Sequence, residues 1–158
     1  MAVAAGIMVP HPPLIVPDVG RGQEILIKDT IKAYQEAAGM AAELKPHAVM
    51  YADYFHVSPG KEARGDFGRC MAPQIGVEAG YDEAFVRELD RLCGDDGFPM
   101  GTEGEREKEL DHGTLVPLYF INQHYRDYKL VRIGGSGLSF ADHYRAGRYI
   151  ARAAENLG

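Results

Sequence analysis

The chain has 158 residues, of which 46% are hydrophobic and 25% are charged, a composition typical of a folded domain and not of a disordered segment. This length fits one domain, which we take as residues 1–158. The chain has 17 Lys and Arg against 23 Asp and Glu, and its net charge of −6 argues against nonspecific binding to nucleic acid.

The cysteines and the N-terminus indicate where the protein resides. Cys70 and Cys93 form neither a C-x-x-C pair nor a disulfide framework, which predicts a reducing compartment. The N-terminus lacks the charged region and cleavage site of a signal peptide. No uninterrupted apolar stretch approaches the roughly 20 residues that a membrane-spanning helix needs. We therefore expect a cytoplasmic protein that does not act in a membrane.

The first quarter of the chain predicts a strand, a stiff turn and a helix. Residues 2–9 form an apolar run without charge, which predicts a buried, central, parallel strand. Residues 11–22 are rich in proline and are not expected to form regular structure, because each proline fixes φ and removes a backbone donor. A helical period then runs from about Gly22 to Pro46. Its apolar face comprises Ile27, Ile31, Tyr34, Ala38 and Ala41.

The middle of the chain has weaker patterns. Residues 47–55, HAVMYADYF, fit a short strand or the loop that follows one. Residues 58–80 are rich in glycine and predict a long irregular segment with one short strand at 74–78; such segments are often functional. Four aromatic residues can line an aromatic pocket or simply belong to the core: Tyr51, Tyr54, Phe55 and Phe67.

The remaining elements have clearer ends. Asp82 predicts the N-cap of a helix that runs through Cys93, with Phe85, Leu89 and Leu92 facing inward. Thr114 is expected to cap a helix with Pro117 in its first turn. Residues 129–133 predict a buried strand, and Ser139 predicts the cap of a helix over 140–156. The buried face of this last helix is expected to include Phe140, Tyr144 and Ala151.

Strands that alternate with helices predict an α/β fold with a mainly parallel central sheet flanked by helices. Ligands of such sheets bind beyond the carboxyl ends of the strands. His11 follows the first predicted strand, and His47 borders the next apolar run. Both are next to a proline that stiffens the backbone, so they are the best pair of metal ligands among the six histidines. Two ordinary loop histidines would show the same pattern.

A third histidine lies in the sequence Asp111-His112-Gly113-Thr114. An Asp before the His and a Gly after it can open a helix, with the imidazole projecting into a cleft. A histidine placed in this way can move a proton or donate to a developing oxyanion. The alternative is a turn with a solvated histidine.

Four strings of the sequence together resemble the LigB-like class III extradiol ring-cleavage dioxygenases, and in particular the N-terminal part of the AmmeMemoRadiSam system protein A group. These strings are VPHPPLIVPDVGRG, PHAVMYADYFHVSPG, GEREKELDHGTLVPLYF and YKLVRIGGSGLS, which are distributed over the whole chain. The resemblance implies that His11 and His47 are metal ligands and that His112 is a catalytic residue near the substrate. It implies Fe2+ as the metal, with Zn2+ as the alternative, and oxygen-dependent cleavage of a catechol-type or other small aromatic ring.

The chain departs from the family pattern in two places. Residues 43–47 join the first helix directly to His47, so that one strand of the family, roughly 5–8 residues long, is missing. The family also continues beyond Gly158 with a motif that carries the expected catalytic base and third metal ligand. We therefore expect a fold that is incomplete at the C-terminus and that forms homo-oligomers through exposed apolar edges. The alternative function is a non-catalytic scaffold that binds Memo-like and radical SAM proteins.

Overall fold

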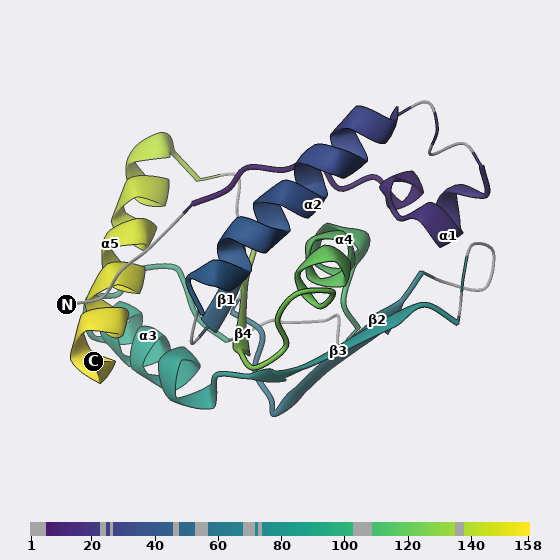
Figure 1. Cartoon of the computed structure of the whole chain (residues 1–158). Helices are drawn as coiled ribbons and strands as arrows, with labels where there is room; N and C mark the ends of the chain where they lie inside the picture. Colours follow the sequence, from purple (N-terminus) through teal and green to yellow (C-terminus); the bar gives the residue numbers. More distant parts are fainter. Residues whose placement is uncertain are drawn as a thin grey trace.

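The computed structural model of the chain shows a mixed α/β fold (Figure 1). It describes residues 6–22, 25, 27–45, 48–52, 57–67, 72, 74–102, 109–134 and 138–158, with the backbone alone described at Asp18 and at 48–52. The expected α/β class is confirmed. No helix in this described part of the chain is both long enough and apolar enough to cross a membrane.

A four-stranded sheet with the order β1-β4-β3-β2 organises the fold. Its strands are β1 (Ala48–Ala52), β2 (Glu62–Asp66), β3 (Gly76–Tyr81) and β4 (Lys129–Ile133). β4 pairs in parallel with β1 over its whole length and with β3 only through Lys129 and Leu130, whereas β2 and β3 form an antiparallel pair. The sheet is therefore mixed, because the glycine-rich segment folds back as β2 and β3 where one short strand was expected.

The helices cover both faces of this sheet. In chain order they are η1 (Pro13–Ile15), α1 (Pro17–Gly20), α2 (Lys28–Glu43), α3 (Glu83–Asp95), α4 (His112–Ile121) and α5 (Phe140–Leu157). The strand β4 separates two hydrophobic clusters: Leu130 packs with residues of α2 and α4, and Val131 and Ile133 pack with residues of α3 and α5. In Figure 1, α2 and α4 accordingly lie on one side of β4, and α3 and α5 lie on the other.

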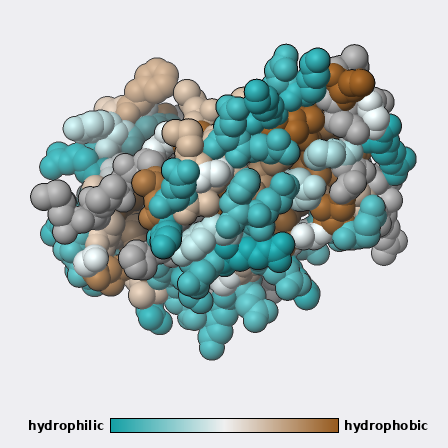
Figure 2. Space-filling view, viewed as in Figure 1, coloured by the Kyte–Doolittle hydropathy of each residue, from teal (hydrophilic) through white to brown (hydrophobic). Residues whose placement is uncertain are grey.

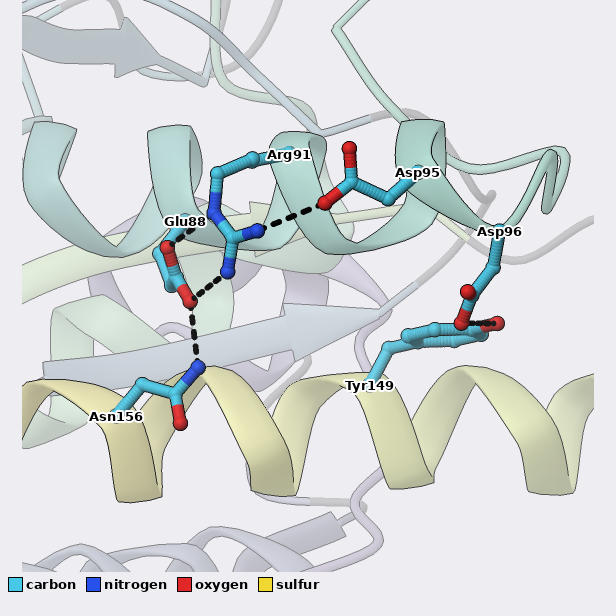
Figure 3. Close-up of polar contacts among 6 residues, drawn as sticks. All are labelled: Glu88, Arg91, Asp95, Asp96, Tyr149 and Asn156. Atoms are coloured by element: carbon cyan, nitrogen blue, oxygen red, sulfur yellow. Dashed lines mark hydrogen bonds and ion pairs between the residues drawn. The ribbon is translucent and has the colours of Figure 1, made fainter.

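Hydrogen bonds between exposed side chains join α3 to α5 (Figure 3). The Glu88 carboxylate accepts hydrogen bonds from Arg91 at 2.8 Å and from Asn156 of α5 at 2.6 Å. Near the other end of α3, the Tyr149 hydroxyl donates to Asp96 at 2.8 Å. These contacts hold the two helices in register over the second hydrophobic cluster.

The N-terminal part of the chain differs from the expected strand. Residues 6–9 have no regular secondary structure, and Ile7 and Met8 are 52% and 100% exposed. Residues 2–5 of the predicted strand lie outside the described residues. Pro10 has no backbone N–H to donate to a neighbouring strand, and no described strand pairs with this segment. The expected first strand is therefore wrong over residues 6–9.

The proline-rich segment that follows is more regular than expected. It contains η1 and the single turn α1, in each of which a proline occupies one of the first two positions. A proline is tolerated there because the backbone N–H that it lacks has no partner within the helix. Proline therefore starts these turns instead of preventing them.

Helix boundaries follow the local sequence signals closely. Ile31, Tyr34 and Ala38 of the predicted apolar face are the buried residues of α2, whereas Ile27 and Ala41 are half-buried. The Asp82 side chain caps α3 by accepting a hydrogen bond from Phe85 N, and Ser139 caps α5 by accepting one from Asp142 N. The helix α4 begins one turn before the start that a Thr114 cap would give: Asp111 is its N-cap, Thr114 lies in its first turn, and Pro117 lies inside it.

The buried face of α5 is a correction. Ala146 and Ala153 are its buried residues, whereas Phe140 and Tyr144 are 95% and 74% exposed and Ala151 is also exposed. Alanine at positions 146 and 153 allows the two helices to approach closely. Moderately hydrophobic side chains, drawn in tan, are visible at the upper left of the surface in Figure 2, over the position of the start of α5 in Figure 1.

Candidate functional site

The N-terminus of α4 is the best-defined polar structure near a predicted site residue. Asp111 Oδ1 accepts hydrogen bonds from both Thr114 N and Thr114 Oγ1 at 2.9 Å. Thr114 is fully buried, so its hydroxyl needs this partner. The Asp111–Thr114 pair fixes the residue at which α4 begins, which is His112.

His112 itself is held against an aromatic side chain. Its ring stacks on that of Phe67 with 5.8 Å between ring centroids and 20° between ring planes. Phe67 is fully buried and follows β2 directly, whereas His112 is half-buried and keeps access to solvent. The predicted helix start at Asp111-His112-Gly113 is thus confirmed, with the imidazole held against the first hydrophobic cluster and still accessible.

The other oxygen of Asp111 contacts the sheet. Arg132 Nη2 of β4 donates to Asp111 Oδ2 at 3.3 Å, and the side chains of Arg132 and Asp111 are 11% and 31% exposed. The backbone of Arg132 also accepts a hydrogen bond from Ser58 N at 3.1 Å. Arg132 therefore connects the start of α4 with the segment that returns to the sheet after β1.

That returning segment lies at the carboxyl end of β4. Val57 forms an isolated bridge with Ile133, the last residue of the strand, and Ser58 is 3% exposed. β1 and β4 are parallel, so their carboxyl ends meet at this edge. This is the edge at which α/β sheets bind ligands.

Close backbone contact joins β2 to the segment before α4. Leu110 N donates to Arg64 O at 3.0 Å, and a Cβ atom built on Gly65 would lie 2.7 Å from Leu110 O. Only glycine leaves room for this approach. The contact brings the residue after β2, Phe67, to the same region as the residue that begins α4, His112.

Of the two expected metal ligands, the structure describes His11 alone. His11 lies between Pro10 and Pro12 in a segment without regular structure, and its side chain is exposed. His47 lies outside the described residues, as does His56. In the part of the chain that the structure describes, no three His, Cys, Asp or Glu side chains form a group that can hold a metal ion. His11, the one expected ligand that is described, does not make a site for Fe2+ or Zn2+ without further ligands.

The surroundings of three other potentially reactive side chains do not indicate a catalytic role. His124 is exposed just beyond α4, and His143 Nδ1 lies 2.9 Å from Ser139 O at the start of α5. Cys93 is buried, and this burial is the main reason that its pKa is raised to about 11. A thiol with so high a pKa is a poor nucleophile near neutral pH, in agreement with the absence of a catalytic cysteine motif.

Sequence reasoning missed Arg132 as part of the site, and it named Asp111 and Thr114 only as neighbours of His112 in one motif. The spacing of Asp111 and Thr114 is that of an N-cap and the third residue of a helix, a signal that was assigned to Thr114 instead. Arg132 is signalled only by its charge within the apolar strand KLVRI. Phe67 was expected in a pocket or in the core; it lies in the core, and its ring contacts that of His112.

Comparison with known proteins provides the context for this geometry. Residues 5–158 match the model of the family described as the catalytic LigB subunit of aromatic ring-opening dioxygenase. The chain is also 34% identical over 165 residues to Protein CA_C1420 of Clostridium acetobutylicum, with 95% of the chain aligned.

The alignment also bears on the length of the chain. The chain spans 35% of the Clostridium protein. The aligned region of 165 residues is longer than the whole 158-residue chain, so the relative has residues within this region that the chain lacks. This agrees with the expectation of a missing segment.

Proposed function

The chain belongs to the family of the catalytic LigB subunit of aromatic ring-opening dioxygenases, and we propose that it acts on a catechol-type or other small aromatic substrate together with O2. The observation that carries this proposal is the placement of His112. Its imidazole is the first side chain of α4, is only half-buried, and rests on the ring of Phe67.

In this proposal His112 exchanges a proton with a hydroxyl group of the substrate. An imidazole suits this role because it gains and loses a proton near neutral pH. The Phe67 ring limits the orientations of the imidazole, and the Asp111 cap fixes the backbone from which it projects. A ring nitrogen must come within about 2.6–3.2 Å of the hydroxyl oxygen for the transfer.

The proposed metal is Fe2+, with Zn2+ as the alternative, and His11 and His47 are the proposed ligands. Bound iron would supply the chemistry with O2, which no side chain of the chain can supply. Two histidines leave a divalent ion with open positions, so further ligands are required.

The test is metal content and oxygen consumption after anaerobic reconstitution with Fe2+. We expect stoichiometric iron in the wild type and oxygen consumption when catechol is added. The double variant His11→Ala/His47→Ala should lose the iron. His112→Gln should keep the iron and lose at least about 100-fold in oxygen consumption, the usual contribution of a general base.

His124→Gln is the matched control, because His124 is exposed beyond the opposite end of α4. It should keep both iron and activity. Wild-type protein that is folded but binds neither Fe2+ nor Zn2+ would contradict the proposal. That result would favour the non-catalytic alternative, in which the domain binds Memo-like and radical SAM proteins, and co-purification with such proteins would then be the next measurement.

A further inference from the structure

Arg132 is the only charged residue between the buried residues of β4, which include Leu130, Val131 and Ile133 at no more than 1% exposure. Its side chain is 11% exposed. A guanidinium held out of water is destabilising unless a negative partner and hydrogen bonds compensate for the lost hydration. A residue of this kind in an apolar strand therefore points to a specific partner.

One partner of Arg132 is Asp111, whose carboxylate has its two oxygens directed to two different elements. Oδ1 accepts two hydrogen bonds from Thr114 in the first turn of α4, and Oδ2 accepts the hydrogen bond from Arg132. Capping a helix requires only one carboxylate oxygen. Oδ2 is therefore available to bind Arg132, and this contact connects the start of α4 to β4.

We infer that Arg132 is a positioning residue for His112, acting through Asp111. The inference rests on the proposed role of His112 as the residue that exchanges a proton with the substrate. His112 follows Asp111 directly, so a carboxylate held from β4 fixes the backbone of His112 relative to the sheet. The Phe67 ring, which directly follows β2, then limits the orientations that the His112 imidazole can adopt. Without Arg132, the start of α4 keeps its cap but loses this ion pair with β4.

The inference can be tested by NMR on the 158-residue chain with 13C-labelled histidine, because this readout does not require activity. The cross-peak of His112 is identified by its absence from the spectrum of His112→Gln. Arg132→Gln and Asp111→Asn should each move this cross-peak and weaken the nuclear Overhauser contact between His112 and Phe67. Arg132→Lys keeps the charge but lacks the planar donor group, so it should give a smaller change.

Two features of the design separate positioning from folding. Asparagine caps helices about as well as aspartate, so Asp111→Asn removes the charge pair and retains the cap. Arg126→Gln is the matched control, because Arg126 donates to Asn122 O at the opposite end of α4. It should leave the His112 cross-peak unchanged.

With catechol as the probe substrate, Arg132→Gln should lower kcat about tenfold or more with little change in KM, because a misplaced proton-transfer group affects the chemical step. An unmoved His112 cross-peak in folded Asp111→Asn would overturn the inference, whether or not Arg132→Gln folds. If the wild type consumes no oxygen, the proposed function fails, and the NMR result still decides whether Arg132 positions His112.

Discussion

Gly65 lies against the backbone of Leu110, two residues before the candidate proton-transfer histidine. A Cβ atom at Gly65 would come within 2.7 Å of Leu110 O and 3.0 Å of Leu110 Cβ. The obstacle is mostly backbone, so it cannot be relieved by rotating a side chain. The absence of a side chain at this one position therefore allows β2 and the segment before α4 to meet.

Gly65→Ala is accordingly expected to lower the free energy of unfolding by about 1–3 kcal/mol, the usual effect of overpacking. Gly39→Ala is the matched control, because Gly39 lies inside α2 and the Cβ atom that alanine adds there would meet nothing within 4 Å. It should raise the free energy of unfolding by about 0.5–1 kcal/mol, since alanine favours a helix. Urea unfolding measures both, and an equal response of the two variants would contradict the close contact at Gly65.

Glu88 gives the fold a pH dependence that can be measured. Hydrogen bonds from Arg91, and then from Asn156, hold the pKa of Glu88 at about 2, below its ordinary value of 4.5. A carboxyl group with a lowered pKa in the folded state stabilises the fold above its unfolded pKa. This contribution is lost progressively as the pH falls from about 4.5 toward 2.

Glu88→Gln should therefore destabilise the protein more at pH 6 than at pH 2.5, as measured by urea unfolding at both values. Arg91→Gln should reduce the same pH-dependent difference, because Arg91 is the first cause of the lowered pKa. A difference in stability between wild type and Glu88→Gln that is the same at both pH values would show that Glu88 does not have this pKa.

At the scale of single elements, the bounds of α5 could be predicted from neighbouring residues, whereas its buried face could not. Its first residue and its Ser139 cap follow from the local sequence, and so do the bounds of β4. Its buried face depends on which side meets α3, and the large side chains Phe140 and Tyr144 pointed to the wrong side. β2 was missed because EARGD has no regular apolar alternation and becomes a strand only by pairing with β3.

Two alanines of α5 provide a matched test of this orientation. Ala153 is fully buried against the second hydrophobic cluster, whereas Ala151 is exposed. Ala153→Leu should lower the free energy of unfolding by about 1–3 kcal/mol through overpacking. Ala151→Leu should change it by no more than about 0.5 kcal/mol. If thermal or urea unfolding shows Ala151→Leu to be the more destabilising variant, the buried face of α5 is the one predicted from the sequence.

At the scale of the whole molecule, the sequence predicted the class of fold and about half of the candidate site. His112 at a helix start follows from a short motif, because an N-cap is a contact between near neighbours. Arg132 could not be predicted in the same way, because its partner Asp111 is 21 residues away in the chain. The antiparallel β2 and the contact at Gly65 likewise exist only once the sheet has formed.

The position of β4 between the two hydrophobic clusters affects which parts of the molecule can unfold locally. Leu130 belongs to one cluster, and Val131 and Ile133 belong to the other. Each cluster can loosen as a separate cooperative unit, but neither can lose β4 without disturbing the other. Amide hydrogens of β4 are therefore expected to exchange with solvent only in the rarest, global openings. The guanidinium that contacts Asp111 projects from this most persistent strand, whereas the helix that carries His112 belongs to one cluster alone.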